Sequence, residues 1–300
     1  MLLLVLAALW GASYLFIKIG LDDLSPAGVV FSRTALATLV LLPFAFASGG
    51  LGPIWRKAHL VFALAAIQVA GPFLLISQGE RHIASSLAGI LVASAPIFTA
   101  LFAIWIDHTE RLHGRGLVGV FVGLVGVGLL LGVDVGGSGA ALAGGLMVVL
   151  ASIGYALGAF ALKRWFSGHP PIALVTSTMG ASALMTVPLF LADLPGHVGL
   201  DTISAMCALG VGGTGIAFVI YYTLNQAVGA TRTALVAYIA PVFAVVYGVT
   251  LLGESFGPGT AAGIVLIIGG SWLAANARRP SLPAARTPQR YPAPVSDAPS

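Results

Sequence analysis

The sequence contains very little charge. Only 8% of its 300 residues are Asp, Glu, Lys or Arg, whereas 58% are hydrophobic. A soluble domain carries roughly 25% charged residues, so this chain cannot cover its own surface with groups that water solvates. A mean hydropathy of +1.00 and long apolar runs place it in a lipid bilayer. The composition therefore excludes a soluble globular protein.

Cysteine and the common catalytic motifs are also scarce. Cys207 is the only cysteine, which leaves no intramolecular disulfide and no thiolate metal site. HExxH, GxxxxGK[ST] and GxSxG do not occur. We therefore expect no metal, no cofactor, no catalytic residue and no self-contained ATP-driven pump. The basic residues are scattered in short loops and near the C-terminus, so nucleic acid is not an expected partner.

Ten apolar runs are each long enough to cross the hydrocarbon core, which takes about 20 helical residues. Turn-forming segments rich in Gly, Pro and Asp separate them. The first run lacks a basic n-region, so we interpret it as an uncleaved helix; whether the chain begins upstream stays open. We expect an all-α integral membrane protein with transmembrane helices near residues 2–20, 27–48, 58–79, 86–106, 116–133, 141–165, 171–192, 202–226, 232–252 and 258–276.

Residues 278–300 differ from the rest of the chain. They are rich in proline and poor in large aliphatic residues, which predicts a disordered tail. If the N-terminus is cytoplasmic, eleven of the 14 Lys and Arg residues fall in cytoplasmic loops or in this tail, and two fall outside. The positive-inside rule then predicts a bacterial-type inner-membrane protein with both termini cytoplasmic.

Several residues recur at a fixed spacing. Pro241 follows Pro96 by 145 residues, and the same spacing or one residue less relates Lys18 to Lys163, Pro43 to Pro188, Glu110 to Glu254, Gly119 to Gly263 and Gly126 to Gly270. The chain is thus predicted to contain two five-helix repeats, residues 1–133 and 141–277. Because five is odd, the second repeat enters the bilayer from the opposite side. Inverted repeats of this kind are typical of secondary transporters, whose substrate site lies between the halves.

The two related prolines lie within apolar runs. A proline inside a helix frees the carbonyl four residues earlier, here that of Val92 or Ala237. An unpaired carbonyl in lipid is unfavourable, so we expect Pro96 and Pro241 to form kinks that frame one cavity and act in gating. The alternative is that both kinks serve packing.

These features together resemble the EamA-type branch of the drug/metabolite transporter superfamily. The resemblance is carried by Trp10-Gly11, by Arg33 in FSRTALATLVLLP, by Pro96 and Pro241, and by the glutamates of DHTERL and LLGESF. It covers residues 1–277 and implies ten helices in two inverted repeats, with export of a small metabolite such as an amino acid. The second copy departs from the pattern, since Thr178 stands opposite Arg33 and Ser152-Ile153-Gly154 replaces the tryptophan-glycine pair.

Polar and aromatic residues deep in the spans are candidate cavity residues. Thr214, Phe218, Tyr221 and Asn225 follow one another at intervals of four, three and four, so they share a helix face. Trp10, Tyr14, Gln68, Tyr155 and Tyr238 complete the predicted substrate cavity. Hydrogen bonding between helices is the alternative for the polar members of the set.

Four further features of the sequence have a predicted role, and two of them have an alternative. Arg33 is either a substrate or gating contact or a structural partner of a loop carboxylate or helix carbonyl. Glu80 is expected at a solvated or locally paired helix end beside Arg81, with proton coupling as the alternative. Glu254, like Glu110, is expected to cap the helix that it precedes. Small-residue pairs are expected at tight helix contacts: Gly119/Gly123, Gly128/Gly132, Gly154/Gly158 and Gly259/Gly263.

The function predicted from these features is secondary transport by alternating access around a central cavity. The expected partners are a small-molecule substrate and the lipid bilayer, and proton coupling and facilitated diffusion both remain open. The alternatives are an intramembrane enzyme acting on a lipid-linked substrate and a non-transporting membrane scaffold. The sequence shows no nucleophile, acid–base pair or metal cluster at one depth, which disfavours the enzyme.

Overall fold

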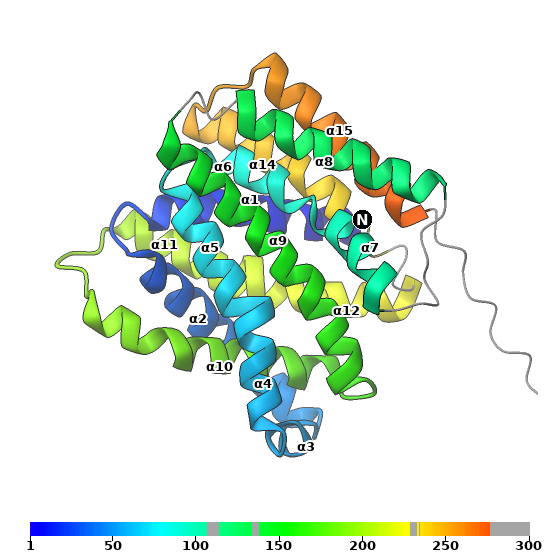
Figure 1. Ribbon diagram of the computed structural model, residues 1–300. Helices are drawn as coiled ribbons and strands as arrows, with labels where there is room; N and C mark the ends of the chain where they lie inside the picture. The colour runs from blue at the N-terminus through cyan, green and yellow to red at the C-terminus, as the bar shows by residue number, and fades with distance from the viewer. Residues whose placement is uncertain (107–113, 134–137, 229–232, 234, 277–300) are drawn as a thin grey trace, which may run out of the picture.

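The computed structural model is a bundle of helices (Figure 1). It describes residues 1–106, 114–133, 138–228, 233 and 235–276, and this part of the chain contains helices and no strands. Within it, 9 helical segments are long and apolar enough to cross a membrane. A shorter apolar helix, Val236–Leu252, lies where another span is predicted. Glu110 and the predicted tail, residues 278–300, fall outside the described residues.

The first half of the chain supplies five crossings. The third consists of α4, a π-helical segment η1 and α5, and the fourth is divided into α6 and α7. The elements are α1 (Leu2–Gly20), α2 (Pro26–Ala47), α3 (Leu51–Trp55), α4 (Ala58–Ala65), η1 (Ala66–Ala70), α5 (Gly71–Glu80), α6 (Ser85–Val92), α7 (Ala95–Ile106) and α8 (Arg115–Val133).

The second half repeats this order, again with a π-helical segment in its third crossing. The elements are α9 (Gly139–Phe166), α10 (Pro171–Ala192), α11 (Leu200–Cys207), η3 (Ala208–Ile216), α12 (Ala217–Val228), α14 (Val236–Leu252) and α15 (Pro258–Asn276). Shifted by 145 residues, η1 falls inside η3. Neither π-helical segment is predicted by the apolar pattern. Such segments often occur at functional sites.

The last helices of the two halves pack antiparallel. A Cβ placed on Gly119 would lie 2.7 Å from the carbonyl oxygen of Gly270, and one on Gly126 would lie 2.8 Å from the Cβ of Leu266. Residue numbers thus rise along α8 while they fall along α15. Glycine at these positions lets the two backbones approach closely.

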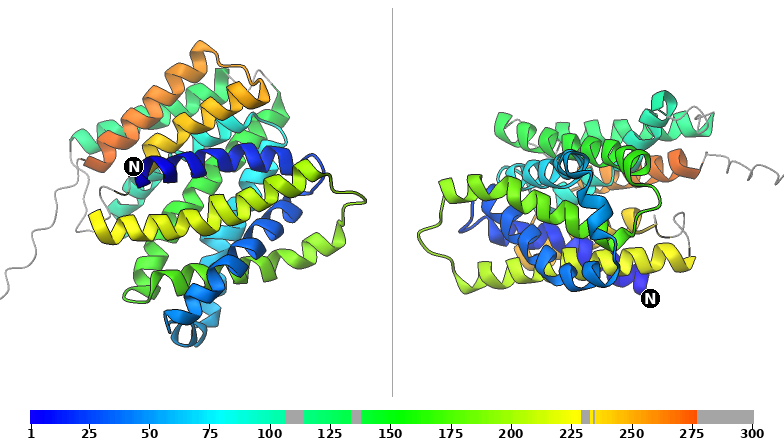
Figure 2. Two further views of the ribbon diagram at one scale, coloured as in Figure 1. Left: turned by 180° about the vertical axis from the view of Figure 1, so that it is seen from behind. Right: turned by 90° about the horizontal axis from the view of Figure 1, so that it is seen from below.

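The second helices of the two halves show the same relation. The Phe31 ring stacks on Phe190 with 4.9 Å between centroids, and Thr38 lies beside Gly180. Corresponding helices therefore run in opposite directions at two separate contacts, as an inverted repeat requires. Figures 1 and 2 show α8 beside α15 on one side of the bundle and α2 beside α10 on the other.

The predicted glycine contacts are confirmed in part. Besides Gly119, a Cβ on Gly154 would lie 2.9 Å from the carbonyl oxygen of Ile67, and Gly263 faces Leu130. The prediction is wrong for Gly128 and Gly132, where an added Cβ would meet nothing within 4 Å. Both glycines lie on a face of α8 that no neighbouring helix covers closely.

Pro96 breaks a helix rather than kinking it. The fourth crossing stops at Val92 and restarts at Ala95, so Pro96 is the second residue of α7, where its missing N–H has no helical partner to lose. Pro241, in contrast, lies inside α14, which continues through it. The two related prolines therefore shape their helices differently.

Serine hydroxyls pair the carbonyls around this break. The hydroxyl of Ser94 donates to the Leu91 carbonyl over 2.6 Å, and Ser152 of α9 donates to the same carbonyl over 3.3 Å. The hydroxyl of Ser271 of α15 donates to the Ala93 carbonyl over 2.9 Å. The broken helix thus has the internal partners that a bilayer demands.

Two loop carboxylates join the halves at one end of the bundle. Asp23 Oδ2 accepts hydrogen bonds from Gly199 N (2.8 Å) and Thr202 Oγ1 (2.7 Å) at the start of α11. The hydrogen bonds from Thr202 and Gly199 lower the pKa of Asp23. In this way a residue of the first half holds the N-terminus of a helix in the second half.

Glu254 makes the reciprocal contact. Its carboxylate accepts hydrogen bonds from Ser85 N (2.6 Å) and Ser86 N (2.9 Å), the first residues of α6. Burial raises the pKa of Glu254, but hydrogen bonds from Ser86 and Ser85 outweigh this effect and hold the pKa below its usual range. The expectation that Glu254 caps the helix it precedes is wrong, because packing between the halves brings α6 closer.

We call this end of the bundle the capped end; it holds residues 21–25, 81–84, 193–199 and 253–257 and lies on the left of Figure 1. The N-terminus and the last residues of α15 lie together at the opposite end (Figures 1 and 2). Lys18, which the sequence places at a helix end near the membrane surface, instead donates to the main-chain oxygens of Glu80 and Ile83. It ties α1 to the connection between α5 and α6.

Gly119→Ala is expected to destabilise the bundle by about 1–3 kcal/mol, the usual effect of overpacking a close contact. The added methyl group would overlap the backbone of α15. Gly128→Ala on the same helix is the matched control, and it should leave stability unchanged or raise it slightly. Thermal unfolding in detergent measures both variants. Equal midpoints for the two would contradict the antiparallel contact.

Asp23→Ala is expected to lower the unfolding temperature at neutral pH, because Gly199 N–H and Thr202 lose their acceptor. The native pKa of Asp23 lies below its unfolded value of about 3.9. Its contribution is therefore present above that value and is lost as the pH falls through the native pKa. The difference in unfolding temperature between Asp23→Ala and the wild type should therefore become smaller at acidic pH. Exposed Asp22→Ala is the control, and an equal loss in both variants would refute the role of Asp23.

Candidate functional site

The side chain of Arg33 in α2 is buried. Its Nε donates a hydrogen bond to Thr214 Oγ1 over 2.8 Å, and its guanidinium carbon lies 3.8 Å from the centroid of the Phe73 ring. Thr214 in turn donates to the Leu209 carbonyl over 2.9 Å. The sequence left open a carboxylate or carbonyl partner, and the structure gives a hydroxyl and an aromatic face. One cation thereby connects α2, α5 and η3.

An aromatic group adjoins this cation. The Trp10 ring of α1 lies 5.5 Å from Tyr221 and 6.0 Å from Phe218, both of α12, and the latter two rings lie 6.4 Å apart. Phe218 also packs against the apolar cluster that contains Phe73. We call these residues the central cluster: Trp10, Arg33, Phe73, Thr214, Phe218 and Tyr221.

Two tyrosines flank the central cluster. Tyr155 of α9 packs against the apolar cluster of Phe73 and against the larger core around α6. Tyr14 of α1 lies against Gly89 of α6, where an added Cβ would be 3.2 Å from its ring. Both tyrosines interact electrostatically with Arg33. Tyr14 of α1 and Tyr155 of α9 thus lie near Arg33, and Phe218 of α12 packs against the apolar cluster that contains Phe73.

Other predicted site residues lie elsewhere. Gln68 of η1 packs against α9, where a Cβ on Gly158 would lie 2.6 Å from the Gln68 Cβ. The Tyr238 hydroxyl donates to the Ser271 carbonyl of α15 over 3.3 Å. Asn225 belongs to α12, but its side chain is outside what the structure describes. The contacts above join Trp10 to Tyr221, place Gln68 against α9 and join Tyr238 to α15.

Glu80 lies in a different environment from the one that the sequence favours. It is predicted to end a solvated or locally paired helix, but its side chain is 0% exposed, while neighbouring Arg81 is exposed. Neither carboxylate oxygen has a hydrogen-bond partner among the described residues. The next segment of the sequence carries a signal for this burial, because the connection to α6 is short and only mildly polar. A connection of that kind keeps Glu80 inside the bundle.

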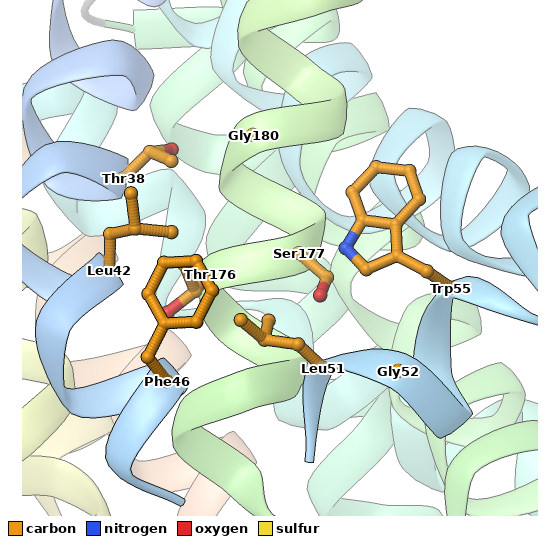
Figure 3. A pocket seen from close by; sticks show the side chains of 9 residues that line it. All are labelled: Thr38, Leu42, Phe46, Leu51, Gly52, Trp55, Thr176, Ser177 and Gly180. Atoms are coloured by element: carbon orange, nitrogen blue, oxygen red, sulfur yellow. The ribbon is translucent and has the colours of Figure 1, made fainter. Parts of the chain in front are cut away.

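A pocket of about 370 Å³ opens where α2, α3 and α10 meet (Figure 3). Its walls come from both halves and are mostly apolar, and the indole nitrogen of Trp55 faces Ser177. The hydroxyls of Thr176 and Ser177 donate to carbonyls of their own helix. The predicted cavity residues do not line this pocket, which lies along the half of α2 farther from the capped end.

Known proteins place the chain among transporters. It is 26% identical to a probable terminal-alkyne amino-acid exporter of Streptantibioticus cattleyicolor, over 88% of this chain and 89% of that protein. It is also 26% identical to the uncharacterized inner membrane transporter YedA of Escherichia coli, over 84% of this chain and 82% of that one. These names indicate a multi-pass inner-membrane transporter rather than an enzyme.

A solved structure and a family model agree with the similarity to transporters. A crystal structure with 22% identity superposes with a TM-score of 0.67, covering 93% of this chain and 98% of the other, which supports the fold. The model of the EamA-like transporter family matches residues 1–132 and matches again at residues 142–276. The two matches coincide with the two halves whose corresponding helices pack antiparallel. The chain belongs to the EamA-like transporter family.

Proposed function

We propose that this transporter exports a small amphipathic metabolite with a carboxylate, such as an amino acid, by alternating access between its two halves. The central cluster supports this proposal most directly. Arg33 can pair with a carboxylate, because a guanidinium carries five N–H donors and its described hydrogen bond uses one. Trp10, Phe218 and Tyr221 supply apolar faces for a side chain.

The relative in Streptantibioticus cattleyicolor, named as a probable amino-acid exporter, supports the same substrate class and direction. The site lies between α1 and α2 of the first half and η3 and α12 of the second half. Movement of one half against the other would therefore change its shape. This is the position that inverted-repeat transporters use for substrate binding.

The two ends of the bundle differ in the contacts between the halves. At the capped end, Asp23 and Glu254 each bind a helix of the opposite half. At the other end, the α2–α10 contact opens into the pocket of Figure 3. With the termini assigned to the cytoplasm by the positive-inside rule, this conformation is closed to the outside.

Opening the outer side would break the two carboxylate contacts. A hydrogen bond to a charged group contributes about 1.5–3 kcal/mol. A substrate can shift an equilibrium only by the difference in its affinity for the two states. Contacts of this size fall within the range that binding of a small metabolite can overcome.

Arg33→Gln is expected to reduce amino-acid transport at least ~10-fold, because ~1.4 kcal/mol is a factor of ten and a charge-assisted pair contributes at least that much. Counterflow of a panel of radiolabelled amino acids into proteoliposomes measures this. Exposed Arg81→Gln is the control. If Arg33→Gln transports amino acids at the wild-type rate, Arg33 does not bind the substrate carboxylate. Failure of the wild-type protein to move any amino acid would refute the substrate class.

A further inference from the structure

Glu80 is a buried carboxylate for which the mechanism above has no use. It ends α5 close to the capped end, and its side chain is completely buried. Asp23 and Glu254 each accept two hydrogen bonds in the same region. Both oxygens of Glu80, in contrast, have no partner among the described residues.

This environment favours the neutral acid. Burial of an ionised carboxylate is unfavourable unless donors or a paired cation compensate, and a protonated carboxyl group avoids most of that penalty. In the conformation described here, Glu80 is therefore held with a proton. Water that reached this position would reverse the preference and favour the anion.

Ionisable groups face Glu80 from the surrounding elements. They are Lys18 and Tyr14 of α1, Arg33 of α2, and Glu254 from the connection between α14 and α15. Tyr155 of α9 lies near Arg33. Lys18 donates to two main-chain oxygens, those of Glu80 and Ile83, and Arg33 donates to Thr214. The hydrogen bonds described for both cations thus go to groups other than the Glu80 carboxylate.

Glu80 also lies close in the sequence to the contact between Glu254 and α6, which breaks when the capped end opens. Only residues 81–84 separate it from α6, whose first N–H groups bind Glu254 of the other half. Lys18 spans the same connection. When Glu254 separates from α6, the other half no longer covers residues 81–84. Water can then reach Glu80, and the ionised carboxylate can pair with Lys18.

We propose that Glu80 is a proton-binding site that is filled when the capped end closes and emptied when it opens, which links transport to the pH on that side; this rests on the proposed transport function. Closing converts the carboxylate and one proton from water into the buried acid. Opening returns that proton to the same water. Acid on the capped side therefore favours return to the closed conformation.

Infrared spectroscopy of the purified protein in lipid tests the site directly. We expect the carbonyl band of a protonated carboxylic acid at neutral pH in the wild type and in Arg81→Gln, and its loss in Glu80→Gln. Because glutamine resembles the neutral acid in size and charge, Glu80→Gln should unfold at the wild-type temperature. An unchanged band in Glu80→Gln, or a lower unfolding temperature, would show that Glu80 is not the buried acid.

A transport assay tests whether the Glu80 proton site makes transport depend on pH. Proteoliposomes loaded with radiolabelled amino acid should release it at a rate that changes several-fold with the outside pH in the wild type and Arg81→Gln, and without pH dependence in Glu80→Gln. If the rate of release by the wild type does not depend on pH, the proton site is refuted and the transport function still stands. Absence of any wild-type release would refute the transport function, and the infrared band would still decide the state of Glu80.

Discussion

The bundle depends on pairing backbone polar groups inside the protein, because lipid offers them no water. Each departure from a continuous helix shows this requirement. Ser94, Ser152 and Ser271 donate to carbonyls beside the break in the fourth crossing. Lys18 donates to carbonyls after α5, and Glu254 accepts N–H groups at the start of α6. Several of these partners come from the other half of the chain, so satisfying the backbone also joins the halves.

The kind of contact between the halves differs from place to place, and this difference suits a transporter. Glycine contacts between α8 and α15 are close and apolar, so they favour a rigid pair. Contacts at the capped end are a few hydrogen bonds to carboxylates, which can break and re-form. The central cluster around Arg33 is also built from both halves. Rocking of one half would leave the glycine contacts intact while it exchanges the polar ones.

The sequence is sufficient for properties that depend on the pattern along one helix. The helix expected from composition at residues 171–192 is found as Pro171–Ala192, and the one expected at 2–20 is found as Leu2–Gly20. Properties that depend on which helices meet are not predictable in this way. The partner of Glu254, the burial of Glu80 and both π-helical segments depend on packing between helices, which spacing alone does not encode.

The central claim is that the two halves have opposite orientations in the membrane, and cysteine labelling tests it most directly. Asp22 follows α1 and Ser167 follows α9, so they occupy corresponding positions 145 residues apart. With exposed Cys207 replaced by serine, a membrane-impermeant maleimide would be applied to intact cells carrying Asp22→Cys or Ser167→Cys. The inverted repeat, with its sides assigned by the positive-inside rule, predicts labelling of Asp22→Cys from outside and of Ser167→Cys only after the cells are opened. Labelling of both from the same side would contradict the inverted repeat.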